Sequence, residues 1–258
     1  MFGICNLSVI PCRKEPADKS EIVTQLLFGD CFEVLDTKGN WTKIKTAYDS
    51  YEGWIDSKQF ITISETNYKK YSKEEVFYTT DLIHPIVVKE TDQIIPILIG
   101  STLHDFSKGE CEIGKIIYTY DGHAVKPNRK KRSDILETAF LFLNAPYLWG
   151  GKSPFGIDCS GLIQTVYKLN NIHLLRDANQ QATQGETLSF IDEAQPGDLA
   201  FFDNDKGKIV HVGIVLPDNK IIHASGKVRI DKLDHHGIFN EETKKYSHNL
   251  RVIKNVFD

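Results

Sequence analysis

Three side chains in the second half of the sequence supply the groups that nucleophilic catalysis by a thiol requires. Cys159 follows a loop rich in glycine and proline, and an amphipathic segment typical of a helix begins at the same residue. A helix N-terminus carries partial positive charge and unpaired backbone N–H groups, so it favours a thiolate and can hold an oxyanion. His211 and His223 follow on two predicted strands. A thiol, a base and a polar group that orients the base form a triad.

The two histidines are expected to lie near the same end of a β-hairpin. The predicted strands 210–216 and 221–223 are separated by the turn Pro217-Asp218-Asn219-Lys220, and a short turn between two strands predicts antiparallel pairing. A single strand histidine is more often structural than catalytic, and Cys159 alone is equally well explained as a small buried hydrophobe. The three residues together favour catalysis.

The elements that must position these residues begin after a basic stretch at 126–132. Helical spacing of apolar residues predicts helices over 133–144, with Ser133 or Asp134 as the N-cap, and over 159–169. Strands then dominate, at 198–202, 210–216, 221–223 and 252–257. Helices followed by a run of strands predict an α+β fold for residues 126–258.

The first half of the sequence reads as β-structure throughout. Short apolar runs with regular turn signals predict a small β-barrel over residues 1–65. Its Gly29-Asp30 turn, Trp41-Thr42-Lys43-Ile44 and Tyr51-Glu52-Gly53-Trp54-Ile55 resemble the corresponding features of a bacterial SH3 domain. Residues 66–125 show the same pattern of short apolar runs, with weaker motifs, and are interpreted as a second, divergent SH3-like barrel.

Composition excludes several classes of protein. The 258 residues contain 31 basic and 35 acidic side chains, for a net charge of -4, so the broad positive field that drives nucleic-acid binding is missing. No apolar run approaches the roughly 18 residues of a membrane-spanning helix. The N-terminus lacks the basic segment of a signal peptide, which predicts a cytoplasmic protein, or a periplasmic or extracellular one if a leader has been removed.

Cysteine usage and histidine spacing indicate no metal site. The five cysteines form no C-x-x-C pair, although a disulfide can still form among Cys5, Cys12 and Cys31. His235 and His236 lie near Asp231 and Asp234, but neighbouring side chains on an extended chain point in opposite directions. We therefore expect neither a metal nor a cofactor, and hydrolysis by cysteine requires none.

Five ordered motifs resemble the NlpC/P60 cysteine peptidases of bacterial cell-wall metabolism. The resemblance covers about residues 133–257 and implies a papain-like α+β catalytic domain. It also implies that Cys159 is the nucleophile, His211 the general base and acid, and His223 the residue that orients His211. The motifs are Tyr147-Leu148-Trp149-Gly150-Gly151, Asp158-Cys159-Ser160-Gly161-Leu162, Pro196-Gly197-Asp198-Leu199, His211-Val212-Gly213-Ile214 and His223-Ala224-Ser225-Gly226.

The same resemblance implies residues that bind substrate. Barrels of SH3 type before such a domain are similar to those of the subgroup that cleaves free γ-D-glutamyl peptides. In that subgroup the residue matching Asp158 binds the amine of an N-terminal L-Ala, and those matching Ser160 and Trp149 line the same site. Tyr147 matches the tyrosine beside the nucleophile. Tyr51 and Glu52 are candidates to close the amine pocket, although ordinary strand-edge residues explain them equally well. Arg176-Asp177-Ala178 resembles a further family segment.

This resemblance implies hydrolysis of L-Ala-γ-D-Glu-(diamino acid) after D-Glu, in turnover or recycling of murein peptides. An unpaired buried Asp158 is expected to penalise substrates whose amine is blocked. Two alternatives stay open: a cell-wall binding module with a vestigial peptidase domain, and an amidase or acyltransferase on the same fold. The choice between lysine and diaminopimelate, the cleavage of polymeric murein and the oligomeric state are not determined by the sequence.

Overall fold

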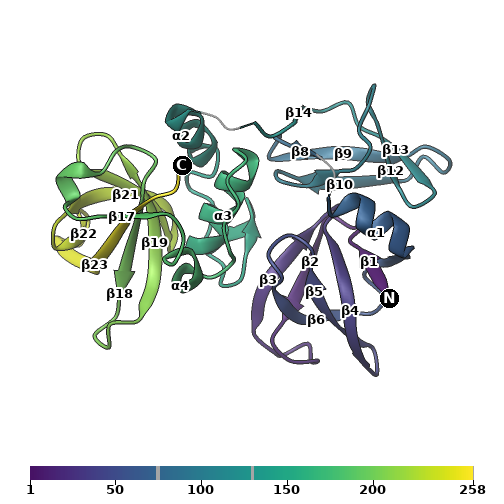
Figure 1. Ribbon diagram of the computed structural model, residues 1–258, viewed down its shortest axis with the longest axis horizontal. Helices are drawn as coiled ribbons and strands as arrows, with labels where there is room; N and C mark the ends of the chain where they lie inside the picture. The colour runs from purple at the N-terminus through teal and green to yellow at the C-terminus, as the bar shows by residue number, and fades with distance from the viewer. Residues whose placement is uncertain (74–75, 129–130, 258) are drawn as a thin grey trace. The chain divides into compact units, whose positions relative to one another are not determined.

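The computed structural model describes residues 1–73, 76–128 and 131–257. The chain divides into two compact units, Met1–Pro127 and Asn128–Asp258, and each is described by itself (Figure 1). Arg129 and Lys130, in the middle of the basic stretch at 126–132, lie outside the described residues. The predicted division of the first unit at residue 65 stays a prediction.

Within residues 1–73, seven strands pair in one antiparallel sheet with the order β3-β2-β6-β5-β4-β1-β7. Buried and less buried side chains alternate along β2 and β5, as expected for strands with one face on a core. A β-bulge between Val34 and Asp36 of β4 bends the sheet toward a barrel. The elements are β1 (Phe2–Ile4), β2 (Val9–Arg13), β3 (Ile22–Leu27), β4 (Cys31–Lys38), β5 (Trp41–Thr46), β6 (Glu52–Asp56), β7 (Ile61–Ile63) and helix α1 (Glu65–Tyr71).

Residues 76–128 form two smaller sheets, with the strand orders β10-β9-β13-β12 and β11-β8-β14. The apolar runs at 83–88, 94–99 and 116–120 lie in three of these strands, to within a residue at each end. The strands are β8 (Phe77–Thr79), β9 (Ile83–Val88), β10 (Ile94–Leu98), β11 (Thr102–Leu103), β12 (Glu110–Ile113), β13 (Ile116–Thr119) and β14 (Ala124–Val125).

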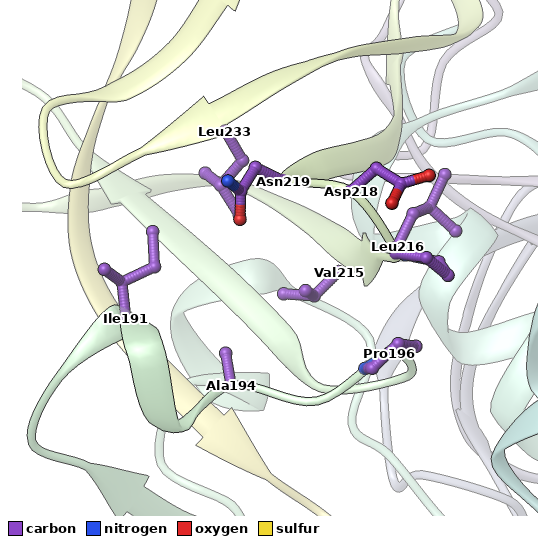
Figure 2. Close-up of a pocket in the computed structure, with 9 residues that line it drawn as sticks. Ile191, Ala194, Pro196, Val215, Leu216, Asp218, Asn219 and Leu233 are labelled. Atoms are coloured by element: carbon purple, nitrogen blue, oxygen red, sulfur yellow. The ribbon is translucent and has the colours of Figure 1, made fainter.

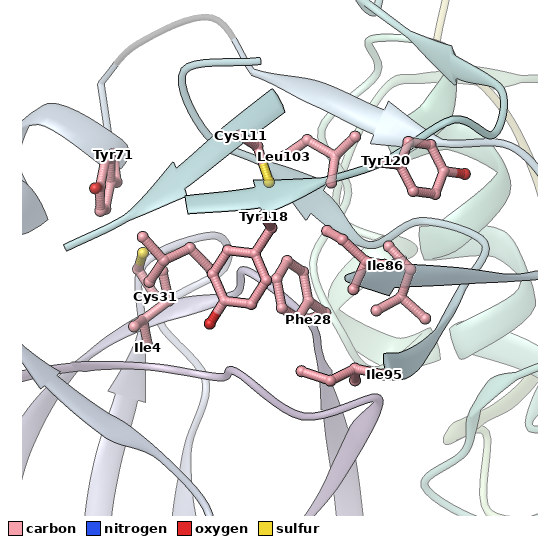
Figure 3. Close-up of a cluster of buried hydrophobic side chains, with 12 residues drawn as sticks. Ile4, Phe28, Cys31, Tyr71, Ile86, Ile95, Leu103, Cys111, Tyr118 and Tyr120 are labelled. Carbon is pink, nitrogen blue, oxygen red and sulfur yellow. The ribbon is translucent and has the colours of Figure 1, made fainter. Parts of the chain in front are cut away.

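One hydrophobic cluster joins the two parts of this first unit (Figure 3). Phe28, on the turn after β3, contacts the ring of Tyr118 of β13 edge to face, with ring centroids 5.2 Å apart. Figure 3 shows Ile4, Phe28 and Cys31 from residues 1–73 facing side chains of the later strands. Because burial of apolar surface is the main favourable term in folding, this shared core explains why residues 1–127 form one compact unit.

The second unit begins with helices and continues with strands, which confirms the predicted α+β class. Helix α2 (Arg132–Phe140) starts earlier than predicted, because Lys131 takes the N-cap position and its backbone N–H donates a hydrogen bond to Oδ2 of Asp134. Helix α3 (Cys159–Leu169) has the predicted bounds. The other elements are β15 (Lys152–Ser153), β16 (Gly156–Ile157), α4 (Ala178–Gln181), β17 (Glu186–Leu188), a 3-10 turn (Ile191–Glu193), β18 (Leu199–Asp203), β19 (Ile209–Leu216), β20 (Lys220–Ser225), β21 (Lys227–Asp234), β22 (Gly237–Asn240) and β23 (Lys245–Asn255).

The large sheet of the second unit closes on itself. Its strands follow the order β17-β23-β18-β19-β20-β21-β22, and β22 also pairs with β23. Helices α3 and α4 pack on β19, and α3 also contacts β20 (Figure 1). The start of α3 is therefore held against the strands that carry the two predicted catalytic histidines.

All five cysteines are buried and none of them forms a disulfide, so the bond that the sequence permitted among the first three does not form. Among the described residues, no helix is both long and apolar enough to cross a membrane.

Candidate active site

Helix α3 presents Cys159 at its first turn. Asp158 is the N-cap residue, and its Oδ1 accepts a hydrogen bond of 2.6 Å from the backbone N–H of Gly161. A side chain at Gly161 would place its Cβ 2.3 Å from the carbonyl oxygen of Gly151, so only glycine allows the helix to approach the preceding loop this closely. The Asp-Cys-Ser-Gly order is thus explained by capping and by packing.

The thiol of Cys159 is buried. Burial and the neighbouring Asp158 raise its pKa to about 12, although the backbone N–H groups of Val212 and Ser160 act in the opposite direction. Val212 directly follows His211 on β19, so the sulfur lies at the strand that carries the predicted base. Because the thiol is protonated at neutral pH, its attack on a peptide requires a base to remove the proton.

A chain of hydrogen bonds extends from His211 into the sheet. His211 Nε2 lies 2.8 Å from His223 Nδ1, and His223 Nε2 lies 3.0 Å from Oδ2 of Asp231. Arg229 holds that carboxylate at both oxygens, with Nε 2.6 Å from Oδ2 and Nη2 2.9 Å from Oδ1. We call His211, His223, Asp231 and Arg229 the histidine relay. Both imidazoles and the carboxylate are buried.

Strand register explains how the relay forms. Gly213 of β19 pairs with His223 of β20, and His223 pairs with Arg229 of β21. His211 lies two residues before Gly213, so its side chain is on the same face as His223 and diagonal to it. A Cβ at Gly213 would lie 3.0 Å from the Cβ of His223 and 2.7 Å from Ile221. Glycine at this position therefore leaves room for the side chains of Ile221 and His223 on the neighbouring strand.

His248 on β23 covers the ring of His211. The two imidazoles stack with centroids 4.0 Å apart and an angle of 21° between their planes. Burial, with smaller contributions from His248 and His223, lowers the pKa of His211 well below its usual value. Burial likewise lowers the pKa of His248 to about 4, helped by His223 and opposed by Asp231. His211 is therefore a neutral base at physiological pH.

The depressed pKa of His248 predicts an acid-sensitive fold. In the unfolded chain a histidine titrates near 6.5, so between pH 6.5 and 4 the unfolded state binds more protons and stability falls as pH falls. We expect the second unit to lose about 1–3 kcal/mol over this window. In a His248→Phe variant, which keeps a ring on His211 without the titration, the loss should be smaller. Hydrogen exchange of α3 amides, corrected for intrinsic rates, measures the free energy of opening at each pH. An equal dependence of this free energy on pH in both proteins would contradict the prediction.

Three ring nitrogens in this region are close enough to suggest metal ligands. One nitrogen each from His211, His223 and His248 lie within 4.8 Å of one another. However, stacking holds His211 and His248 in nearly parallel planes with centroids 4.0 Å apart, and tetrahedral zinc separates two nitrogen ligands by about 3.3 Å, more than the 2.8 Å between His211 Nε2 and His223 Nδ1. The arrangement fits a hydrogen-bond relay. His235 and His236 do not diverge as predicted: they lie on a turn, with centroids 3.9 Å apart.

Asp158 differs from its prediction in one respect. Arg176, which is 1% exposed, binds both of its oxygens, with Nη2 2.7 Å from Oδ2 and Nη1 3.0 Å from Oδ1. Oδ2 also accepts from the backbone N–H of Gly150, and Oδ1 from the Ser160 hydroxyl. The expectation that this carboxylate is unpaired without a substrate amine is therefore wrong. The predicted part of Asp158 and Ser160 in substrate binding stays a prediction.

A cavity of about 260 Å³ adjoins His211. Burial raises the pKa of Tyr147, and Cys159 and Asp158 raise it further, so the phenol keeps its proton and can donate a hydrogen bond. The tyrosine thus lies near the nucleophile, as predicted. Trp149 does not line the cavity and is 59% exposed on the adjoining loop. The walls are formed by Tyr147, Val210, His211, Ala224, Ser225, Gly226 and His248.

A second cavity, of about 180 Å³, lies at the opposite end of β19 (Figure 2). Its walls are mostly aliphatic, and Figure 2 shows Asp218 and Asn219 as its polar side chains, on the turn between β19 and β20. It is lined by no cysteine, histidine or other predicted site residue. The chemistry is therefore expected at the first cavity.

Tyr51 and Glu52 belong to the first unit, at the start of β6. Glu52 is exposed and forms an ion pair of 2.8 Å with Lys43 on the neighbouring strand, and Tyr51 is half-buried. Their predicted part in binding the substrate's amine stays a prediction.

Three residues of the site were not anticipated as parts of it, namely Arg229, Asp231 and His248, and Arg176 was named only within the segment Arg176-Asp177-Ala178, without a role. Asp231 was considered only as a possible metal ligand beside His235 and His236. The alternation Val228-Arg229-Ile230-Asp231 after the turn at Gly226 was a usable signal, since it predicts a strand paired with β20. No local signal identifies His248, because only closure of the sheet brings β23 to this position.

Comparisons with known proteins find a matching family model in each of the two units. A model of the NlpC/P60 family matches residues 144–247, and one described as a bacterial dipeptidyl-peptidase Sh3 domain matches residues 12–60. The gamma-D-glutamyl-L-lysine dipeptidyl-peptidase of Bacillus subtilis (strain 168) is 28% identical over 227 residues, covering 79% of this chain and 72% of that protein. The probable endopeptidase NlpC of Escherichia coli (strain K12) is 42% identical over 113 residues, covering 40% of this chain and 72% of that protein.

A solved structure shares the fold. The crystal structure of an NlpC/P60 family protein from Bacillus cereus ATCC 10987 matches with a TM-score of 0.83 at 20% identity, covering 100% of both chains. The chain belongs to the NlpC/P60 family of cysteine peptidases. In front of the peptidase domain it carries a bacterial SH3 domain of the dipeptidyl-peptidase type. The resemblance inferred from its motifs is thereby confirmed.

Proposed function

We propose that the protein hydrolyses the bond between γ-D-Glu and a diamino acid in murein peptides with a free N-terminal L-Ala, and so releases L-Ala-D-Glu. The observation that carries this proposal is the match to a gamma-D-glutamyl-L-lysine dipeptidyl-peptidase over 79% of the chain. That match is too long to lie in the catalytic unit alone. The complete histidine relay beside Cys159 supports hydrolysis rather than binding by a vestigial domain.

The proposed steps use groups that the site provides. His211 removes the proton of the Cys159 thiol as the sulfur attacks the carbonyl carbon, and the backbone N–H of Cys159 helps to hold the oxyanion. The protonated imidazole then donates that proton to the leaving amine, and the C–N bond breaks. Water, activated by the same imidazole, hydrolyses the thioester and restores the free thiol.

The size of the cavity also favours a peptide substrate. At about 260 Å³, the space beside His211 is small, and its walls include the small side chains of Ala224, Ser225 and Gly226. A long acyl chain requires an extended apolar groove. The alternative of an acyltransferase on lipid amides therefore has no specific observation in its favour.

A panel of short peptides tests the substrate. L-Ala-γ-D-Glu-L-Lys should yield L-Ala-D-Glu and lysine, whereas its N-acetylated form should be cleaved at least about tenfold more slowly, since one lost charged hydrogen bond costs about 1.5–3 kcal/mol. The α-linked isomer is the matched control for the γ bond, and a diaminopimelate peptide compares the two diamino acids. Products are measured by mass spectrometry. Equal rates on the free and acetylated peptides would contradict amine recognition, and equal rates on the two isomers would contradict γ specificity.

A further inference from the structure

The histidine relay includes a carboxylate and a guanidinium beyond the two imidazoles. Asp231 lies beyond His223, and its side chain is only 3% exposed. Its two oxygens accept three hydrogen bonds, one from His223 and two from Arg229. The guanidinium of Arg229 also contacts Glu242, at 3.2 Å. Because these hydrogen bonds engage both of its oxygens, the buried carboxylate is held in one orientation and in its ionised form.

The positions of the ring protons follow from these partners. Burial acts to raise the pKa of Asp231, but the hydrogen bonds from His223 and Arg229 outweigh it and the pKa is lowered. A carboxylate only accepts hydrogen bonds, so Nε2 of His223 must carry a proton. With one proton on each imidazole, Nδ1 of His223 is an acceptor, and Nε2 of His211 must donate to it. This leaves Nδ1 of His211 without a proton.

We propose that Asp231, held by Arg229, is a positioning residue that fixes the tautomers of both histidines, so that Nδ1 of His211 is always available as the base. This inference rests on the proposed roles of Cys159 and His211. Asp231 takes up no proton during the reaction. When His211 accepts the proton of the thiol, its Nε2–H bond to His223 persists, and the carboxylate stabilises the resulting positive charge through His223.

Arg229 holds the carboxylate of Asp231 in a single orientation. It lies directly opposite His223 in the register of β20 and β21, and its two donors face the two carboxylate oxygens in the bidentate geometry that an arginine and a carboxylate favour. With both oxygens engaged, the carboxylate cannot turn away from His223. The arginine therefore acts through Asp231.

The variant Asp231→Asn tests the proposal, because an amide has one acceptor where the relay uses two. Arg229 donates to both positions, so the amide NH₂ faces a donor of Arg229 in either arrangement: Nη2 at the Oδ1 position in the first, and Nε together with Nε2 of His223 at the Oδ2 position in the second. In the second arrangement the NH₂ donates to His223, both tautomers reverse, and Nδ1 of His211 acquires the proton. We expect kcat to fall about 10²-fold with KM unchanged within about twofold.

The matched control is Asp234→Asn on the same strand. Asp234 is also hydrogen-bonded, to the Tyr246 hydroxyl and the backbone N–H of His236, but it contacts neither catalytic histidine, so kcat should stay within about twofold of the unmodified protein. Arg229→Gln, which keeps the carboxylate and frees its orientation, should lower kcat about tenfold. It provides a second test if Asp231→Asn fails to fold.

Proton positions are read directly from ¹H–¹⁵N correlation spectra of the imidazoles in the full chain. The unmodified protein should show His211 and His223 protonated at Nε2, and Asp231→Asn should show protonation at Nδ1. A kcat within twofold of the unmodified protein would overturn the proposal, as would a large loss with both tautomers unchanged. Hydrolysis that survives Cys159→Ala would instead remove the proposed nucleophile, and the spectra would still report on Asp231.

Discussion

A Cys159→Ala variant is expected to lose peptidase activity, with kcat lower by about 10⁴-fold or more, because no other group in the site can form the thioester. The fold should persist, since alanine is a good helix former at the first position of α3 and Asp158 still caps the helix through Gly161. Substrate affinity should change little. The variant therefore separates chemistry from binding.

The measurement is single-turnover and steady-state hydrolysis of the free tripeptide, with binding followed by calorimetry. Cys111→Ala is the matched control, because Cys111 is also a free, buried cysteine but lies in the core of the first unit; it should retain kcat within about twofold. Activity of Cys159→Ala above about one percent of the unmodified protein would show that another residue is the nucleophile.

Replacing Arg176 with methionine is expected to have the largest effect on stability. The arginine is 1% exposed and binds both oxygens of Asp158, so its loss leaves a buried carboxylate without its charged partner. Breaking a buried pair in this way costs about 3–5 kcal/mol. Because Asp158 caps α3 at the nucleophile, the variant should also lower kcat. Methionine keeps the straight chain of arginine and limits the cavity.

A double variant distinguishes the ion pair from simple packing. Asp158→Asn keeps an acceptor for the N–H of Gly161, so Asp158→Asn/Arg176→Met should be more stable than Arg176→Met alone by about 1–3 kcal/mol. The free energy of opening is measured by hydrogen exchange of α3 amides, which reports on the second unit. If the free energy of opening of the double variant falls by the sum of the decreases in the two single variants, the two side chains are not coupled.

The structure also changes the explanation of amine selectivity. The sequence suggested that a buried Asp158 is unpaired until it binds the substrate's ammonium group. In the structure Arg176 already balances the charge of the carboxylate, which accepts five hydrogen bonds. Selectivity for a free amine cannot then arise from an unpaired carboxylate. The acetylated tripeptide in the substrate panel measures the selectivity independently of this explanation.

The sequence by itself determined the local parts of the site. Apolar residues at helical spacing and the loop rich in glycine and proline before Cys159 place the thiol at the first turn of α3, since these signals act within a few residues. The turn at 217–220 likewise determined the hairpin that carries His211 and His223. Fold class followed from the order of such elements, and the motifs identified the family.

Only the tertiary structure decided which side chains complete the site. Asp231 reaches His223 because β21 pairs with β20 in one register, and a slip of one residue would turn its side chain to the other face. Arg176 reaches Asp158 from a loop, and His248 reaches His211 because β23 closes the sheet. Pairings of this kind depend on the register and closure of segments distant in sequence, so no local pattern of residues contains them.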